Sequence, residues 1–228
     1  MIYDLLLELP LFQGLSHDQL TAIVEQVAFR FERFQPGDVI VEAGAPCSEV
    51  TFVLSGEVEQ QTLLAEGRLT VVQTFEAPQT ITFCNLFGTQ TAQPSSLKAL
   101  TQVGVMRVAK EQFLKMLQLN RVILVGALNI LSAHAQKQHH VLAAAVQPDA
   151  TLRLASWLLL YTERSASAIS IEAQPEAWCG LLNLDQATFW HGVSQLEADK
   201  WIRFEGSVLK LTDRYGLRSY VGRKMSDK

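Results

Sequence analysis

Donor side chains suited to nucleic acid gather near the C-terminal end of the sequence. Lysine, arginine, threonine and glutamine donate hydrogen bonds to phosphate oxygens, and the cations supply the attraction on which such contacts depend. The candidates for phosphate contacts are Thr188, Gln195, Lys200, Arg203 and Lys210. Acidic residues in the same stretch, Glu197, Asp199 and Glu205, weaken the positive field, and each cation alone also fits a solvated surface charge. The cluster predicts a modest positive surface.

The spacing of apolar residues predicts the elements that hold this cluster. In LLNLDQATFWHGVSQLEADKWI, residues 181–202, apolar side chains recur at mixed three- and four-residue steps that are broken near Asn183. This pattern is typical of two short helices that meet at a tight turn, where asparagine can adopt a positive φ. A helix is expected after Pro148, then the weak strand ISIEA, and WIRFEGSVLKLTD predicts two strands around Gly206. The outline is a winged helix-turn-helix.

The first half of the chain predicts a mostly β domain. Ser16 is placed to cap a short amphipathic helix. From Phe31 the apolar period changes to two, and four alternating or β-rich runs are punctuated by glycines. Short strands with glycine turns at roughly ten-residue spacing predict an antiparallel sandwich or roll. The predicted fold class is therefore α+β.

A helical pattern follows Lys110 and continues to about Val146. Its apolar positions alternate between four- and three-residue steps, as in a coiled-coil seam. The predicted seam residues are Leu117, Leu124, Leu128, Leu131, Ala135 and Leu142. A helix over residues 111–147 would project beyond a β domain of this size, which favours a coiled coil in a symmetric homodimer. The alternative is a helix packed on its own domain.

Composition and charge narrow the class of protein. The 228 residues are 48% hydrophobic and 18% charged, which predicts a folded chain of two domains. The start lacks a basic leader, and the longest uncharged apolar run, 122–133, is too short to cross a bilayer, so we expect a cytoplasmic protein. The net charge of −4 predicts no general affinity for nucleic acid. After Pro148, however, ten basic residues face ten acidic ones, against nine and thirteen before it.

The cysteines and histidines predict no metal or cofactor site. Cys47, Cys84 and Cys179 lie far apart and form no C-x-x-C pair, so buried small hydrophobic roles are expected. Histidines at 134, 139 and 140 fall on the expected long helix, where two adjacent histidines cannot share a face. The sequence has no evident nucleophile–base pair or glycine-rich phosphate loop, and we expect no enzymatic activity.

The order of these parts resembles the Crp/Fnr family of bacterial transcription regulators over nearly the whole chain. LPLFQGLSHDQLTAI and FERFQPGDVIVEAGAPCSEVTFVLSGEV carry the family's leucine-phenylalanine start, its P-G-D/E-x-I-x-x-x-G turn and its L-x-G-x-V strand. The resemblance implies a cyclic-nucleotide-binding-like β-roll, a double-stranded jelly roll, in residues 1–110. A long dimerisation helix over 111–147 and a winged helix-turn-helix over 148–228 follow. The flanking helices and C-terminal module favour this family over cupins and other jelly rolls.

The helix-turn-helix stretch resembles the family pattern L-x-x-x-L-G-x-x-x-x-T-V-S-R-x-L-x-x-L-E-x-x-G-L-I. The family's base-reading positions fall on Gln186, Ala187 and His191, where its arginines and glutamate are missing. Gln186 can pair with adenine and His191 can donate to guanine or phosphate, but each lost bidentate arginine contact removes about 1–3 kcal/mol of discrimination. Trp190 can stack on sugar or thymine methyl groups, or be a partly exposed aromatic on the helix flank. The resemblance implies an A/T-leaning site or weak binding.

The ligand positions of the β-roll also depart from the family. In members that bind cyclic nucleotides, a G-E-[LF]-[GA] turn and an R-[ST] pair hold the sugar and the cyclic phosphate. The matching positions here are Thr82, Phe83, Cys84, Asn85, Gln93 and Pro94. A buried phosphate without a cation costs on the order of several kcal/mol, so we expect no binding of cyclic AMP or cyclic GMP. The region fits a neutral small-molecule effector of unknown identity, or a filled core.

The resemblance implies a homodimeric transcription regulator that binds double-stranded DNA at a two-fold-symmetric site. RNA polymerase and an unidentified small-molecule effector are further candidate partners, and no membrane partner is expected. The alternative is a regulatory or interaction protein that keeps the fold but has lost tight DNA binding. The missing arginines favour this alternative, whereas the two-domain layout favours the regulator.

Overall fold

The structure is a computed structural model that describes residues 2–81, 83–145 and 147–226. Its contacts divide the chain into two compact units. The N-terminal unit consists of Met1–Glu59 and Phe75–Ala135, and the C-terminal unit consists of Gln60–Thr74 and Gln136–Lys228. The mixed α+β architecture that the sequence predicted is confirmed.

The N-terminal unit contains the predicted β-roll. A four-stranded sheet has the order β1-β8-β3-β6, formed by Arg30–Phe34, Val103–Ala109, Glu49–Ser55 and Gln79–Thr80. Separately, β2 (Val39–Val41) pairs antiparallel with β7 (Ser96–Ala99). The hairpin strands β4 (Glu57–Leu64) and β5 (Leu69–Glu76) are joined by a short 3₁₀ turn. At Gly56 a positive φ and the closeness of the Gln102 carbonyl leave no room for a Cβ atom, which explains the glycine between β3 and β4.

The apolar residues of the roll and of the flanking helices form one core. Helix α1 (Ile2–Glu8) and helix α2 (His17–Val24) contribute leucines and isoleucine to it, and the Phe12 and Phe52 rings meet with centroids 5.5 Å apart. The Ser16 hydroxyl accepts from the Gln19 backbone N–H, and the Gln19 side chain accepts from the Ser16 N–H. The predicted N-cap of α2 is therefore confirmed, as a capping box.

The prediction of a single helix over residues 111–147 is wrong, because the structure has two helices there. Helix α3 (Lys110–Leu119) and helix α4 (Arg121–Ala145) meet at Asn120 at an angle of 119°. Asn120 has an extended backbone, and its side-chain oxygen accepts from the Val122 N–H at 2.8 Å. A new helix thus begins with an asparagine cap, although the apolar period runs through the break. No single helix of the described chain is long and apolar enough to span a membrane; only α3 and α4 taken together pass that test, as a bent pair.

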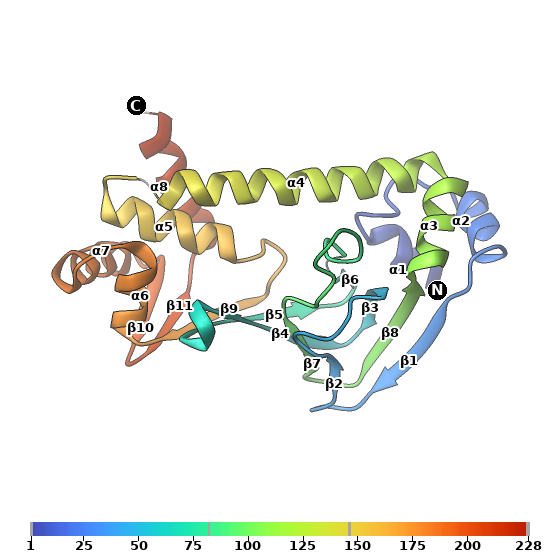
Figure 1. Ribbon diagram of the computed structural model, residues 1–228, viewed down its shortest axis with the longest axis horizontal. Helices are drawn as coiled ribbons and strands as arrows, with labels where there is room; N and C mark the ends of the chain where they lie inside the picture. Colours follow the sequence, from blue (N-terminus) through green and yellow to red (C-terminus); the bar gives the residue numbers. More distant parts are fainter. Residues whose placement is uncertain (1, 82, 146, 227–228) are drawn as a thin grey trace. The chain divides into compact units, whose positions relative to one another are not determined.

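The C-terminal unit contains the predicted winged helix-turn-helix elements (Figure 1). In chain order they are α5 (Ala150–Tyr161), β9 (Ala168–Ala173), α6 (Pro175–Leu182), α7 (Gln186–Ala198), β10 (Ile202–Glu205) and β11 (Val208–Leu211). A further helix, α8 (Arg214–Ser226), was not expected from the sequence. Leu217 is its one fully buried apolar residue, so its apolar signal is weak.

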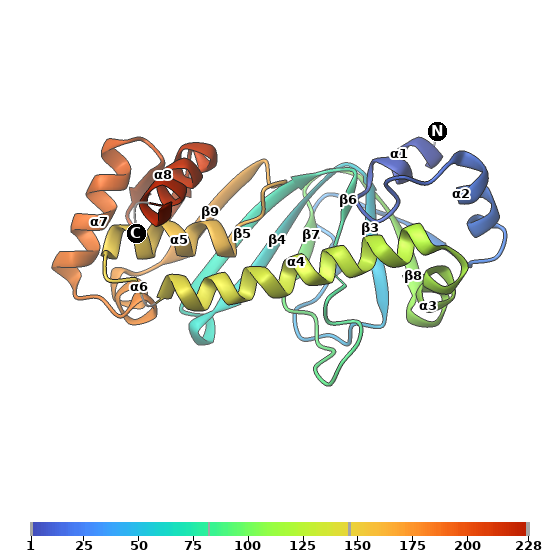
Figure 2. The same cartoon turned by 90° about the horizontal axis from the view of Figure 1, so that it is seen from above.

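A strand from the first half of the chain completes the sheet of the C-terminal unit. Strand β5 pairs antiparallel with β9 from Leu69↔Ala173 to Thr74↔Ala168, and Figure 2 shows β4, β5 and β9 side by side. Leu69 and Val71 are buried in the same core as Trp178. The sequence placed residues 60–74 in the first domain, whereas here they pack with the winged module. The boundaries at residues 110 and 147 stay predictions.

Candidate nucleic-acid interface

The turn between α6 and α7 has the conformation that the sequence predicted. Asn183 adopts the left-handed region, with φ 50° and ψ 57°, at the C-terminal end of α6. Arg153 of α5 donates to the Leu182 carbonyl at 2.7 Å and to the Asn183 carbonyl at 3.2 Å. These bonds satisfy carbonyls that the end of α6 leaves without helical partners. This positioning role could not be predicted from sequence, because the partners lie 29 and 30 residues away.

Helix α7 has one face buried in the core and one face exposed to solvent. Phe189, Val193 and Leu196 are buried in the core of the C-terminal unit. The predicted base-reading residues Gln186, Ala187 and His191 are all exposed, together with Trp190. The structure therefore brings the predicted reading residues together on one helix, with their side chains open to solvent.

At the start of α7, two predicted DNA-contact residues, Thr188 and Gln186, have acidic partners. Asp185 caps the helix: its carboxylate accepts from the Thr188 N–H at 2.8 Å and from the Thr188 hydroxyl at 2.8 Å. The backbone bond from Thr188, followed by the hydroxyl bond, lowers the pKa of Asp185. The Gln186 amide donates to Glu176 of α6 at 2.9 Å. A phosphate or base that approaches this end of α7 meets two carboxylates.

A chain of polar contacts fixes the middle of the reading face. Thr151 of α5 is buried and donates its hydroxyl to Gln195 Oε1 at 2.6 Å. The Gln195 Nε2 atom lies 3.0 Å from the Nε2 atom of His191. Gln195, predicted as a phosphate contact, therefore links Thr151 of α5 to the His191 ring and orients that ring. With Gln195 as donor, this geometry leaves the opposite ring nitrogen of His191, Nδ1, to carry the proton.

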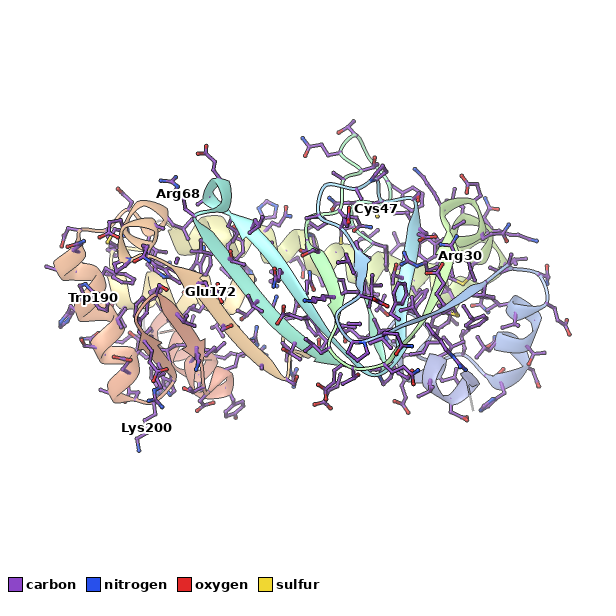
Figure 3. All side chains as sticks on the ribbon, turned by 90° about the horizontal axis from the view of Figure 1, so that it is seen from below. Arg30, Cys47, Arg68, Glu172, Trp190 and Lys200 are labelled. Carbon is purple, nitrogen blue, oxygen red and sulfur yellow. The ribbon has the colours of Figure 1, made fainter. Side chains whose placement is uncertain are left out.

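Trp190 extends the apolar part of the interface toward the wing, which is the hairpin of β10 and β11. Its ring lies 5.4 Å from Phe189 and 5.2 Å from Phe204 of β10, both edge to face. The side chain is nevertheless 40% exposed, and Figure 3 shows Trp190 and Lys200 at the outer edge of the module. Both sequence-based interpretations, a flank aromatic and a stacking surface, fit this position.

The wing holds its cations against one carboxylate. Arg203 and Lys210 face each other in the β10–β11 register, and Glu205 lies 2.6 Å from Arg203 Nη2 and 3.6 Å from Lys210 Nζ. Lys200 is exposed and has no ion-pair partner within the described part of the chain. The carboxylate of Glu197 accepts from the Phe204 N–H at 2.7 Å, which ties α7 to the wing. Of the predicted phosphate contacts, Arg203 and Lys210 thus lie side by side and are both paired with Glu205.

The described effector positions lie in different local environments. Phe83 is buried and packs on Phe113 with ring centroids 5.1 Å apart, so it belongs to the core. Asn85 donates to the Ala92 carbonyl at 2.8 Å, and Gln93 exchanges backbone bonds with residues 44 and 45. Cys84 is half-buried and Pro94 exposed, while Thr82 lies outside the described residues. The effector pocket stays a prediction.

The cysteines differ in burial. Cys47 is buried, and burial raises the pKa of its thiol, as expected for a small hydrophobic side chain. Cys84 and Cys179 are half-buried, and burial also raises the pKa of the Cys179 thiol. In the part of the chain that the structure describes, histidine, cysteine and acidic side chains nowhere form a group of three that could hold a metal ion.

Helix α4 presents part of the predicted seam to solvent. Ile123 and Ala127 pack on the N-terminal core, whereas Leu124 and Leu128 are 39% and 53% exposed. Ala135 is also exposed, Leu131 packs partly on the core, and the Leu142 side chain lies outside the described residues. Leu117 belongs to α3 and packs on the core, so it does not continue the stripe of α4. The exposed stripe is shorter than the predicted one.

Residues 31–120 match the family model of the cyclic nucleotide-binding domain. Among curated proteins, a 116-residue stretch is 25% identical to part of the potassium channel SKOR of Arabidopsis thaliana, covering 49% of this chain. The chain spans 13% of the channel's length.

Two solved structures share the fold over nearly the whole chain. The catabolite activator protein of Thermus thermophilus has a TM-score of 0.51 and 13% identity, and the match covers 94% of this chain and 99% of that one. A chain from Eubacterium rectale assigned to the Crp/Fnr family of transcriptional regulators has a TM-score of 0.52 and 13% identity, with 93% and 98% covered. At this identity the comparisons show a common fold.

Proposed function

Starting from a chain that contains a cyclic nucleotide-binding domain and has the fold of the Crp/Fnr regulators, we propose that it is a homodimeric, sequence-specific DNA-binding transcription regulator. Its effector in this proposal is a molecule other than cyclic AMP. The observation that carries the proposal is the exposed face of α7, where Gln186, Trp190 and His191 stand on a helix whose opposite face is buried. Residues of these types read base edges and stack on sugars when a helix enters the major groove.

The support for a dimer is the apolar stripe of α4. Leu124, Val125 and Leu128 are each more than a third exposed on a helix whose other side packs on the core. A second copy that covered this stripe would bury apolar surface at about 25 cal/mol per Å². It would also present two reading helices, as a two-fold-symmetric DNA site requires.

The dimer can be tested with one charged substitution and its match. Leu128→Glu places a carboxylate in the middle of the stripe, and we expect a monomer in analytical ultracentrifugation. Leu63→Glu is the control, because Leu63 is 60% exposed on β4 and lies outside the stripe. A variant L128E that sediments with the same mass as the wild type would contradict the proposed interface.

DNA binding can be tested by selection of random duplexes with the purified dimer. Enrichment of a two-fold-symmetric sequence is expected, and the variant His191→Ala should lose preference at one position of each half-site, by about 1–3 kcal/mol. His139→Ala on α4 removes an exposed histidine outside the reading face and serves as the control. Equal effects of the two variants would contradict the reading role of His191.

The effector is addressed by equilibrium binding of labelled cyclic AMP. No cationic side chain occurs from Thr89 to Leu97, which is the stretch that would face the cyclic phosphate. We expect no saturable binding at micromolar concentration. Saturable binding in that range would contradict this part of the proposal and leave the DNA-binding part standing.

The carboxylates that pair with the cations of the wing and stand near α7 favour a second candidate function. Glu205 holds Arg203 and Lys210, and carboxylates at 176 and 185 face the start of α7. These contacts support a regulatory or interaction protein that keeps the fold without tight DNA binding. Absence of any enriched sequence at low salt, with the dimer intact, would select this candidate.

A further inference from the structure

A solvent-open cavity of about 280 Å³ lies in the C-terminal unit, and none of its lining residues belongs to α7 or to the wing. It is formed by the later part of α4, the end of α5 with the loop that follows it, and α8. Five of its seven lining residues are charged: Lys137, Glu163, Arg164, Arg214 and Arg218. Leu159 and Thr162 complete the lining. Its volume is near the lower end of the range for small-molecule sites.

The charges around this cavity do not balance. Four cations face the single carboxylate of Glu163, whose Oε1 atom lies 2.7 Å from Lys137 Nζ. Arg164 and Arg218 have no hydrogen-bond or ion-pair partner within the described residues. Burial lowers the pKa of Arg214, Glu163 opposes this shift, and the charges of Arg218 and Arg164 add to it. The cavity therefore concentrates positive charge that the protein itself leaves uncompensated.

The walls that carry these cations are fixed by hydrogen bonds. The Arg214 guanidinium donates to the carbonyls of Leu159 at 2.9 Å and Thr162 at 3.0 Å, at the C-terminal end of α5. The loop after α5 is attached to β5, where Ser167 N–H donates to the Thr74 carbonyl at 2.8 Å and the Glu163 N–H donates to Gln73. Arg214 and Arg218 are one helical turn apart on α8 and point to the same side. The cations thus converge on a preformed space.

We propose that this cavity binds a small phosphate-bearing anion. Arginine guanidinium groups bind phosphate through paired, charge-assisted hydrogen bonds, and Lys137 can add a point charge when the anion displaces Glu163. Leu159 offers an apolar contact for a small organic body next to the phosphate. The bound anion would join α4, the loop after α5 and α8, and would hold the later part of α4 against the winged module. This inference does not depend on whether α7 reads DNA.

The test is calorimetric titration of the full-length protein with inorganic pyrophosphate and with ribose 5-phosphate at constant ionic strength. Saturable binding is expected, and Arg218→Ala and Arg164→Ala should each weaken it about tenfold or more. Glu163→Gln should tighten it, because it removes the internal competitor of the anion. Arg223→Ala is the matched control, since Arg223 lies on α8 and does not line the cavity. Pyrophosphate alone would indicate an inorganic ligand, and ribose 5-phosphate a phosphate ester.

Three outcomes would overturn the proposal. The first is absence of saturable binding of either probe to the folded wild-type protein. The second is equal weakening by R223A and R218A, which would indicate a diffuse field instead of a site. The third is loss of duplex affinity in R218A without any pyrophosphate binding to the wild type, which would assign these cations to DNA. Circular dichroism of each variant checks folding, and Arg218→Lys, which keeps the charge, should retain part of the affinity.

Discussion

The two compact units hold their strands together by different means. In the N-terminal unit, Arg107 of β8 is 11% exposed and binds Glu32 of β1 at 2.9 Å and Glu49 of β3 at 2.6 Å. A third bond runs from its guanidinium to the Ile40 carbonyl at 2.7 Å. In the C-terminal unit, the strands are joined by buried apolar residues of β5 and β9, and the ion pairs described between its strand residues stand at the wing, where Arg203 is 69% exposed.

This difference separates structural charges from available ones. A nearly buried arginine with three fixed partners cannot leave them without exposing uncompensated carboxylates. An exposed pair contributes about 0–1 kcal/mol and exchanges readily with other ions. The cations of the wing are therefore masked by Glu205 but remain available to a phosphate, whereas Arg107 is committed to the roll.

The largest effect is expected from Arg107→Met. The substitution removes the buried cation that Glu32 and Glu49 share and leaves these partly buried carboxylates only the exposed Arg30, and we expect a loss of about 3–5 kcal/mol in the free energy of unfolding. Arg30→Met is the control, because Arg30 contacts the same two carboxylates but is 61% exposed, and it should cost less than about 1 kcal/mol. Urea denaturation measures the free energy of unfolding of both variants. Equal losses in the two variants would contradict the proposed difference between buried and exposed ion pairs.

The second expected effect concerns the apolar joint of the C-terminal unit. Leu69→Ala removes a fully buried side chain of β5 from the core around Trp178 and should cost about 2–4 kcal/mol. Leu63→Ala, on the exposed side of the same hairpin, should cost little. Hydrogen exchange should show the loss of protection in β9 and α5. Loss confined to the β-roll would contradict the assignment of residues 60–74 to the winged module.

That assignment also shows what the sequence could and could not reveal. In β5 the residues Leu69, Val71, Gln73 and Phe75 are buried in strict alternation, so the pattern predicts a strand with one covered face. The pattern does not say which strand pairs with β5, because β9 lies about a hundred residues further on. The Asn183 turn and the Ser16 cap were predictable, since each depends on neighbours within a few residues.

The misjudged parts have physical causes of the same kind. The break at Asn120 was missed because a helix cap interrupts the backbone without interrupting the apolar period. Helix α8 was not predicted because Leu217 is its one fully buried apolar residue. Two cations of the cavity, Arg214 and Arg218, lie on this helix and were therefore not predicted either. The predicted reading residues could be located on one face, but their acidic partners Glu176 and Asp185 could not be assigned from type alone.

A smaller effect is expected from unmasking the wing. Glu205→Gln frees Arg203 and Lys210, and we expect duplex affinity to rise by up to about 1 kcal/mol, or roughly fivefold, per chain. The salt dependence should steepen as well, because more counterions are released. Glu172→Gln, an equal change of charge on β9 of the same unit, is the control. Equal gains from both variants would mean that net charge, and not the ion pairs of the wing, limits binding.

The smallest effect is expected at the start of α7 and depends on pH. Hydrogen bonds from Thr188 lower the pKa of Asp185 below its ordinary value of 3.8, so the carboxylate stabilises the folded helix above that value and loses this role as the pH falls through the lowered pKa. The protection factor of the Thr188 amide, which is the intrinsic exchange rate at each pH divided by the rate measured by NMR, should therefore fall as the pH is lowered from about 5 to about 2.

Asp185→Asn keeps a cap without a titrating group, so this pH dependence should disappear in the variant. The same substitution removes a negative charge from the end of α7 that would approach phosphate, and duplex affinity at neutral pH should rise by less than in E205Q. The relative size of the two gains in duplex affinity distinguishes the reading helix from the wing. A larger gain from D185N than from E205Q would place the main barrier to DNA at the reading helix, where the missing arginines also lie, and would reduce the wing to a minor contact.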